Sequence, residues 1–438
     1  MEAEMKNVTE YPLSSYQKDI WLEQCMYPGK PIYNIGGYTE IKGEINVPIF
    51  NQAIQVFINR NEMMRANVTE RDGVPYLNIL SESLYELPVH DFSGKENSRE
   101  FCMEWMRGEF QKPFDMGKQL FQFDLLKWSD NQYFVFIKAF HLIIDGWGFV
   151  LTHKQIIENY NELYREGKTE EKPVYSYHDF LLEDQSYHDS KSFIKDREFW
   201  MEKYLTIPEP LFNRNANGTD PDGQSDWSGR RVLKIDRELY NRIIQFSEER
   251  GCSVFHFVLG TLFTYFSRVC DKEEVVIGVP VLNRSKTKYK QTMGHFANVI
   301  PLRISPGSDI SFQELVKYIK NELMDCYRHM RVSTGEIYRS VFSTANEKSS
   351  LFDLSFSYEK HGATESFVDA EIGSHVMLPH HHERNALTVY LREYEDAEVY
   401  IDFSYRMDVF DKFIPIENVV SHFDFLFRQV LEYHESGI

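Results

Sequence analysis

The most constraining part of the sequence is a segment in which an apolar strand pattern, a short loop and a helical pattern follow one another. Residues 133–139 are rich in aromatic and β-branched side chains, which is typical of a buried strand. Beyond Gly146 and Gly148, apolar residues recur with the spacing of one helix face, at Ile156, Ile157, Tyr160, Leu163 and Tyr164. A strand that passes through a loop into a helix predicts a mixed α/β fold, and it places His141 on that loop.

The chain is longer than one hydrophobic core usually supports. It has 438 residues, beyond the length at which single cores stop growing. Its 42% hydrophobic and 15% aromatic content is sufficient for two cores. The charged run at residues 168–172, followed by Pro173, has the composition of a connector. We therefore predict two lobes, residues 1–172 and residues 173–438.

The second half of the chain also mixes helical and strand patterns. Ser253 is expected to cap a helix that runs to Arg268, and Ser311 with Glu314 forms a capping-box pattern ahead of another helix. Strands are expected at residues 274–281, 351–358, 387–391 and 399–403, and a closing helix at residues 417–435. Both lobes are therefore expected to combine helices with a sheet.

Net charge and cysteine usage argue against several functional classes. A net charge of -19 and a pI of about 5.3 oppose binding to nucleic acid or to an anionic membrane surface. The five cysteines include no Cys-x-x-Cys pair, which argues against a disulfide framework and against a zinc site. The sequence shows no export signal and no apolar run of about 18 residues. We therefore expect a cytoplasmic protein without a membrane span.

The loop after the predicted strand carries one imidazole and one carboxylate among apolar residues. His141 titrates near neutrality, and a buried Asp145 is tolerated only when it is paired. Gly146 and Gly148 permit backbone conformations, including positive φ, that a branched residue beside a substrate does not adopt. A structural alternative stays open, in which His141 is satisfied by a backbone carbonyl and Asp145 caps the following helix. The spacing by itself favours this structural alternative.

Several further segments, in order along the chain, carry a resemblance to a known family. The pattern His-x-x-x-Asp-Gly-Trp at residues 141–147 resembles the core motif of condensation domains of non-ribosomal peptide synthetases, which belong to the chloramphenicol acetyltransferase-like superfamily. Other family motifs are similar to SSYQKDIW at 14–21, RNEMMR at 60–65, YHDF at 177–180, residues 277–284, MGHFAN at 293–298 and residues 351–358. The matches extend over nearly the whole chain, which makes chance agreement improbable.

The sequence departs from the family pattern at three positions. Phe140 stands where the family usually has the first of two adjacent histidines, Gly148 stands where serine is common, and Asn61 stands where histidine is common. The family assigns catalysis to the second histidine, which is retained here as His141. The acid that marks a heterocyclising relative is absent, so cyclisation is disfavoured.

The resemblance implies a fold and a set of site residues. The implied fold is α/β, with two chloramphenicol acetyltransferase-like lobes in a V-shaped pseudo-dimer around a central tunnel. His141 is implied to be catalytic and to face the reacting amine in that tunnel. Gly146 is implied to help bind the oxyanion, and Asp145 is implied to form an ion pair with Arg284 that supports the active site. Trp147 and Asn298 are the expected substrate-binding residues.

The resemblance also implies an activity. The chain is expected to be an acyltransferase that forms an amide bond between a carrier-protein-bound acyl or peptidyl thioester and the amine of a carrier-bound aminoacyl group. Phosphopantetheine arms of donor and acceptor carrier proteins are expected to deliver both substrates, with an adenylation domain downstream or in trans and no tightly bound cofactor. The general-base and the electrostatic role of His141 both stay open. No metal is expected, because the cluster His380, His381 and His382 lacks ligand spacing.

The subtype is less constrained than the family. The motifs begin within about 15 residues of Met1, so we expect a starter (lipo-initiating) or free-standing domain of the kind found in lipopeptide and antibiotic biosynthesis. An epimerisation domain, a CoA-dependent acyltransferase and a catalytically silent recruitment domain remain alternatives. The acyl donor, the amino acid and the final product are not predicted.

Overall fold

The computed structural model describes residues 8–212, 227–307, 310–342, 350–361, 366–379, 381–394 and 399–433. The chain forms two compact units. Unit 1 comprises Met1–Ser190, Leu282–Ala297 and Thr364–His380, and unit 2 comprises Lys191–Val281, Asn298–Ala363 and His381–Ile438. Both units mix helices and sheets, so the predicted α/β class is confirmed. The single boundary between residues 172 and 173, the V-shaped arrangement and the tunnel stay predictions.

Unit 1 is built around a five-stranded sheet with the order β12-β2-β7-β6-β5. The strands are β12 (Ala370–Met377), β2 (Asn34–Gly43), β7 (Gln132–Phe140), β6 (Phe121–Ser129) and β5 (Val89–Asp91), and only the pair of β5 and β6 is parallel. β7 lies in the middle of the sheet and is buried on both faces, which explains its nearly continuous apolar sequence. A smaller sheet joins β1 (Val8–Pro12), β4 (Val74–Leu80) and β3 (Ala66–Arg71).

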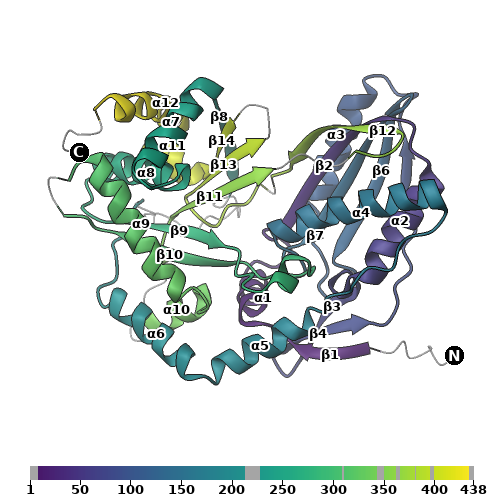
Figure 1. The fold of residues 1–438 in the computed structure, drawn as a ribbon, viewed down its shortest axis with the longest axis horizontal. Helices are drawn as coiled ribbons and strands as arrows, with labels where there is room; N and C mark the ends of the chain where they lie inside the picture. The colour runs from purple at the N-terminus through teal and green to yellow at the C-terminus, as the bar shows by residue number, and fades with distance from the viewer. Residues whose placement is uncertain are drawn as a thin grey trace. The chain divides into compact units, whose positions relative to one another are not determined.

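Helices cover both faces of the larger sheet of unit 1 (Figure 1). Residues of α2 (Val47–Arg60) and α4 (Gly146–Glu166) pack with Ile41 and Ile137 in one core, whereas α3 (Ser98–Phe110) packs against Tyr38 and Phe136 on the opposite face. The remaining elements of unit 1 are α1 (Ser15–Met26), η1 (Glu62–Arg65), α5 (His178–His188) and η2 (Thr287–Lys290). Because α4 follows β7 directly, the loop between them is held at the end of a buried strand and the start of a packed helix.

Unit 2 contains a six-stranded sheet with the order β10-β9-β11-β13-β14-β8. The strands are β10 (Asn298–Ile304), β9 (Val275–Val281), β11 (Leu354–His361), β13 (Leu387–Tyr394), β14 (Val399–Arg406) and β8 (Ser228–Ile235). β11 runs parallel to both of its neighbours, and the other pairs are antiparallel. The strands predicted at 274–281, 351–358, 387–391 and 399–403 correspond to β9, β11, β13 and β14.

Helices pack on one face of this sheet around a single apolar core. They are α6 (Lys191–Lys203), α7 (Arg237–Glu249), α8 (Val254–Val269), α9 (Phe312–Arg328), α10 (Thr334–Val341), α11 (Met407–Phe413) and α12 (Ile416–Tyr433). The predicted capping box is present at the start of α9, where Ser311 and Glu314 bond to each other's backbone N–H groups. In the described part of the chain, no helix has the length and apolarity needed to cross a membrane.

Candidate functional site

The His141 loop is anchored by its backbone and by buried apolar side chains. The backbone N–H of His141 donates to the carbonyl of Tyr33, the residue just before β2, at 2.8 Å. The next three residues, Leu142, Ile143 and Ile144, are fully or almost fully buried in the core of unit 1. Each buried side chain of this size contributes about 1.5–3 kcal/mol through loss of contact with water. The loop is therefore a fixed part of the core.

Asp145, the N-cap residue of α4, accepts hydrogen bonds from three donors. Its Oδ1 accepts from the N–H of Gly148 at 2.8 Å and from Arg284 Nη2 at 2.7 Å, and its Oδ2 accepts from the N–H of Phe296 at 3.0 Å. Burial raises the pKa of this carboxyl, but the Arg284 guanidinium and these hydrogen bonds outweigh burial, so the pKa lies below its ordinary value. Helix capping and ion pairing, which the sequence left as alternatives, therefore occur together.

Arg284 lies in the segment Leu282–Ala297, which packs against the His141 loop, and its guanidinium bonds to several carbonyls of that segment. Besides Asp145, its guanidinium donates to the carbonyls of Tyr289, Thr292 and Gly294, and it lies 4.1 Å from the centre of the Phe296 ring. The ion pair of Asp145 with Arg284 that the family resemblance implies is therefore present. It holds the segment 282–297 against the His141 loop.

The imidazole of His141 is half-buried, and its environment favours the neutral ring. Its Nδ1 atom is buried and has no hydrogen-bond partner of acceptable geometry within the described residues. Desolvation lowers the pKa of His141 below its ordinary value, although backbone groups of His141 and Ile144 and the charge of Asp145 partly oppose this effect. The alternative in which a backbone carbonyl satisfies His141 therefore stays open, because backbone groups of His141 and Ile144 act on the ring.

A second imidazole, which sequence reasoning did not select, lies beside His141. The ring of His295 meets the ring of His141 edge to face, with centroids 5.1 Å apart and an interplanar angle of 81°. Burial and the charge of His141 lower the pKa of His295 to about 3. The sequence signal for His295 was its place in the family-like segment MGHFAN at 293–298. Local spacing does not predict its contact with His141, because the two residues are far apart along the chain.

The two glycines of the loop do not use the positive φ that glycine permits. Neither Gly146 nor Gly148 has a positive φ, because both lie in the first turn of α4, where the backbone is helical. Gly148 is required for a different reason: a Cβ atom there would lie 2.8 Å from Ile144 and 3.2 Å from Met293. A Cβ on Gly146 would meet no atom within 4 Å, so the backbone of Gly146 borders open space.

The two expected substrate-binding residues are already engaged in structural contacts. The indole N–H of Trp147 donates to the carbonyl of Lys290 at 2.8 Å, which ties α4 to η2. Asn298 belongs to unit 2, where its amide N–H groups donate to the carbonyls of Met330 and Val332, both at 2.8 Å. A role of either residue in substrate binding stays a prediction.

Four of the other family segments meet around the same loop in unit 1. The Gln17 side chain, held in a capping box with Ser14, donates to the carbonyl of Leu142 at 3.0 Å. The carboxylate of Glu62 accepts from the N–H of Tyr177, whose hydroxyl in turn donates to the carbonyl of His295. The segments at 14–21, 60–65, 177–180 and 293–297 are thus connected by hydrogen bonds in unit 1.

Phe140 occupies the position at which the family usually has the first of two adjacent histidines, and in this structure the side chain at that position only fills the core. Its side chain is buried in the core of unit 1, edge to face with the rings of Tyr33 and Phe114. The side chain at this position therefore fills the interior, whereas His141 is the residue with partial access to solvent. The departure at Phe140 leaves the imidazole of His141 in place.

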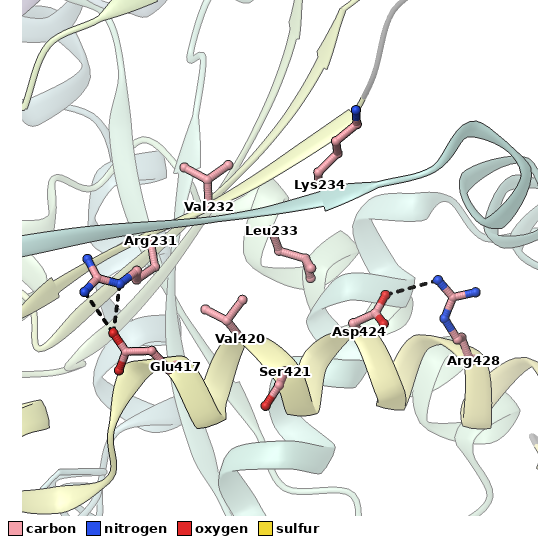
Figure 2. Close-up of a pocket in the computed structure, with 9 residues that line it drawn as sticks. All are labelled: Arg231, Val232, Leu233, Lys234, Glu417, Val420, Ser421, Asp424 and Arg428. Carbon is pink, nitrogen blue, oxygen red and sulfur yellow. Dashed lines mark hydrogen bonds and ion pairs between the residues drawn. The ribbon is translucent and has the colours of Figure 1, made fainter.

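A groove of about 530 Å³ on unit 2 offers no comparable chemistry (Figure 2). It lies between β8 and α12, with Leu233 and Val420 among its lining residues. The ion pairs of Arg231 with Glu417 and of Asp424 with Arg428 also line it. Its lining contains no histidine, so proton transfer near neutral pH has no evident agent there. Within the described residues no cluster of three or more potential metal ligands is found, and His380 lies outside them.

Comparison with known families extends the resemblance over the chain. A family model described as "Condensation domain" matches residues 7–438. Surfactin synthase subunit 1 of Bacillus subtilis (strain 168) is 29% identical over 415 residues, which is 92% of this chain and 11% of the relative. A dimodular nonribosomal peptide synthase of the same organism is 26% identical over 333 residues, which is 76% of this chain and 14% of the relative. The chain thus spans less than a fifth of the length of these two relatives.

Solved structures agree with the fold. The first condensation domain of the calcium-dependent antibiotic synthetase, in complex with a substrate analogue, gives a TM-score of 0.81 at 19% identity and covers 98% of both chains. The starter condensation domain of rhizomide synthetase RzmA gives a TM-score of 0.79 at 21% identity, also with 98% of both chains covered. These similarities confirm the predicted chloramphenicol acetyltransferase-like fold class.

Proposed function

The chain belongs to the condensation domain family, and on this premise we propose that it joins a carrier-bound acyl or peptidyl thioester to the amine of a carrier-bound aminoacyl group. The observation that carries the proposal is the His141 imidazole, half-buried and held by a rigid loop that the pair of Asp145 and Arg284 supports. The activity is that of an acyltransferase that forms an amide bond.

His141 is the residue we assign to proton transfer. The amine nitrogen forms a bond to the thioester carbon, the C–S bond breaks, and one amine proton is transferred through the imidazole to the departing thiolate. Such a base must be neutral before the reaction, and the lowered pKa of His141 supports this state near pH 7. Because Nδ1 is buried, we assign the transfer to Nε2.

Gly146 is the residue we assign to contact with the thioester. It is exposed, and the space beside its Cα is open, so a thioester can approach its backbone without meeting a side chain. Its N–H belongs to the first turn of α4, where backbone N–H groups have no partner within the helix. This free N–H is suited to stabilise the negative charge that develops on the thioester oxygen.

The partners follow from the activity. Donor and acceptor carrier proteins would present their substrates on phosphopantetheine arms, and an adenylation domain, downstream or in trans, would load the acceptor. The relatives are several times longer than this chain, which fits a division of labour between condensation and the other steps. We further propose a starter or free-standing type, supported by the similarity to the starter condensation domain of rhizomide synthetase.

One assay tests this function. An acyl-loaded donor carrier is incubated with an aminoacyl-loaded acceptor carrier, and the intact mass of the acceptor is followed. Amide product that disappears in His141→Ala but persists in His381→Ala, a change at an exposed histidine, supports condensation. An acceptor of unchanged mass whose amino acid, once released and separated on a chiral column, is racemised indicates epimerisation. Acylation from free acyl-CoA alone indicates a CoA-dependent enzyme. No turnover with any donor leaves a recruitment role.

A further inference from the structure

His295 lies in direct contact with His141, the proposed base, and has no part in the proton transfer proposed above. Its side chain is 6% exposed and meets the His141 ring edge to face. Neither Nδ1 atom makes a hydrogen bond of standard geometry within the described residues, and the backbone groups that act on the rings are those of Ala297 for His295 and of His141 and Ile144 for His141. The edge-to-face contact therefore places a second buried polar ring directly beside the proposed base.

The backbone around His295 is fixed on both sides. Its carbonyl accepts from the Tyr177 hydroxyl, and the next N–H, that of Phe296, donates to Asp145 at 3.0 Å. The preceding residue, Gly294, has a φ of +154° and lies so close to the Tyr177 ring that a Cβ would approach it to 2.2 Å. The structure therefore holds the His295 ring in one place beside His141.

Burial, together with the charges around the two rings, determines which of them is protonated first. Asp145 favours protonation of both rings, whereas Arg284 and a protonated His141 oppose protonation of His295. Burial reinforces this opposition, and the pKa of His295 falls to about 3. His295 therefore remains neutral when His141 takes up a proton.

We propose that His295 is a positioning residue for His141: its neutral imidazole holds the His141 ring in place and provides the polar neighbour that the His141 imidazolium requires. The inference rests on the proposed function, because it matters for catalysis only if His141 carries the amine proton. While the proton resides on His141, the bare nitrogen of His295 offsets the desolvation of the new charge. An apolar side chain of similar size offers no such compensation.

Histidine-selective NMR measures this effect without relying on turnover. In the full chain labelled with [¹³Cε1]histidine, the His141 signal is identified by its loss in His141→Gln and is followed from pH 5 to pH 8. The expected wild-type midpoint lies below 6.5. In His295→Met we expect this midpoint to fall by about 0.5 pH unit or more, because the imidazolium loses its polar neighbour. In His295→Gln, where an amide replaces the imidazole, we expect it to stay near the wild-type value.

Single-turnover amide formation provides the second readout. We expect the rate constant to fall about tenfold or more in His295→Met and to recover most of that loss in His295→Gln. An unchanged His141 midpoint in His295→Met, or equal loss of activity in both variants at an unchanged midpoint, would overturn the inference. If the chain forms no amide but the NMR midpoints move as expected, the proposed function fails while the coupling of the two rings holds.

Discussion

Arg284 and Asp145 are 139 residues apart in the sequence, yet Arg284 Nη2 donates to Asp145 Oδ1 at 2.7 Å. Their side chains are only 2% and 1% exposed, so water screens neither charge. The carboxylate also caps α4, and the guanidinium also accommodates three carbonyls of the segment 282–297. This pair therefore determines where the His141 loop and the His295 segment meet.

Removal of the guanidinium leaves the Asp145 carboxylate buried without its counter-charge. For Arg284→Met we expect the free energy of unfolding to fall by about 3–5 kcal/mol, because an uncompensated buried charge is costly. Urea denaturation followed by circular dichroism measures this loss. The matched control is Lys286→Met on the same segment, whose exposed pair with Glu183 is worth no more than about 1 kcal/mol. Equal losses in the two variants would contradict a supporting role for the buried pair.

The two glycines of the loop provide a second, internally controlled test. Gly148→Ala places a methyl group against Ile144 and Met293, and we expect it to destabilise the protein by about 1–3 kcal/mol through overpacking. Gly146→Ala meets open space in a helical turn and is expected to leave the melting temperature unchanged or slightly raised. If Gly146 contacts the thioester, however, its alanine variant loses amide formation while it remains folded. Calorimetry and the carrier assay together separate these effects, and a fully active Gly146→Ala would argue against oxyanion binding there.

Asn298 is expected to stabilise unit 2 through its amide. It donates to the carbonyls of Met330 and Val332 and accepts from the N–H of Thr334 at 3.2 Å, so Asn298→Ala leaves several buried groups unpaired. We expect a loss of about 2–3 kcal/mol in urea denaturation. The exposed Asn418→Ala serves as control and is expected to change stability by less than about 0.5 kcal/mol. Unchanged stability with lost activity in Asn298→Ala would instead support direct substrate contact.

Glu383 in unit 2 predicts a pH dependence of stability. Burial raises the pKa of Glu383 to about 7, although hydrogen bonds from Ser404 and Thr388 lower it in part. The folded state therefore binds more protons than the unfolded state between pH 4.5 and about 7, and stability falls as the pH rises through this range. In the wild type this decrease amounts to about 3 kcal/mol, and Glu383→Gln is expected to remove it. Urea denaturation at several pH values measures it, with the exposed Glu371→Gln as control, and parallel curves for wild type and Glu383→Gln would contradict the assignment.

Local patterns in the sequence determined the elements that carry the site. The strand before His141 and the helix after Gly146 follow from apolar spacing, and the capping box at Ser311 follows from residues three positions apart. Such features depend on neighbours in the chain, which is why residue spacing predicts them. The family, and with it the candidate base, followed from motifs in their expected order.

The tertiary structure decided which distant residues share the site. Three contacts join segments that are separated along the chain. His141 meets His295 edge to face, the Tyr177 hydroxyl donates to the His295 carbonyl, and Asn298 donates to the carbonyl of Val332 within unit 2. The positive φ that Gly146 permits is not used, because Asp145 caps a helix that already includes that glycine. The spacing of residues in the sequence limits which roles a residue can have. Burial and pairing with distant residues, which arise only when the whole unit packs, determine which of these roles it has.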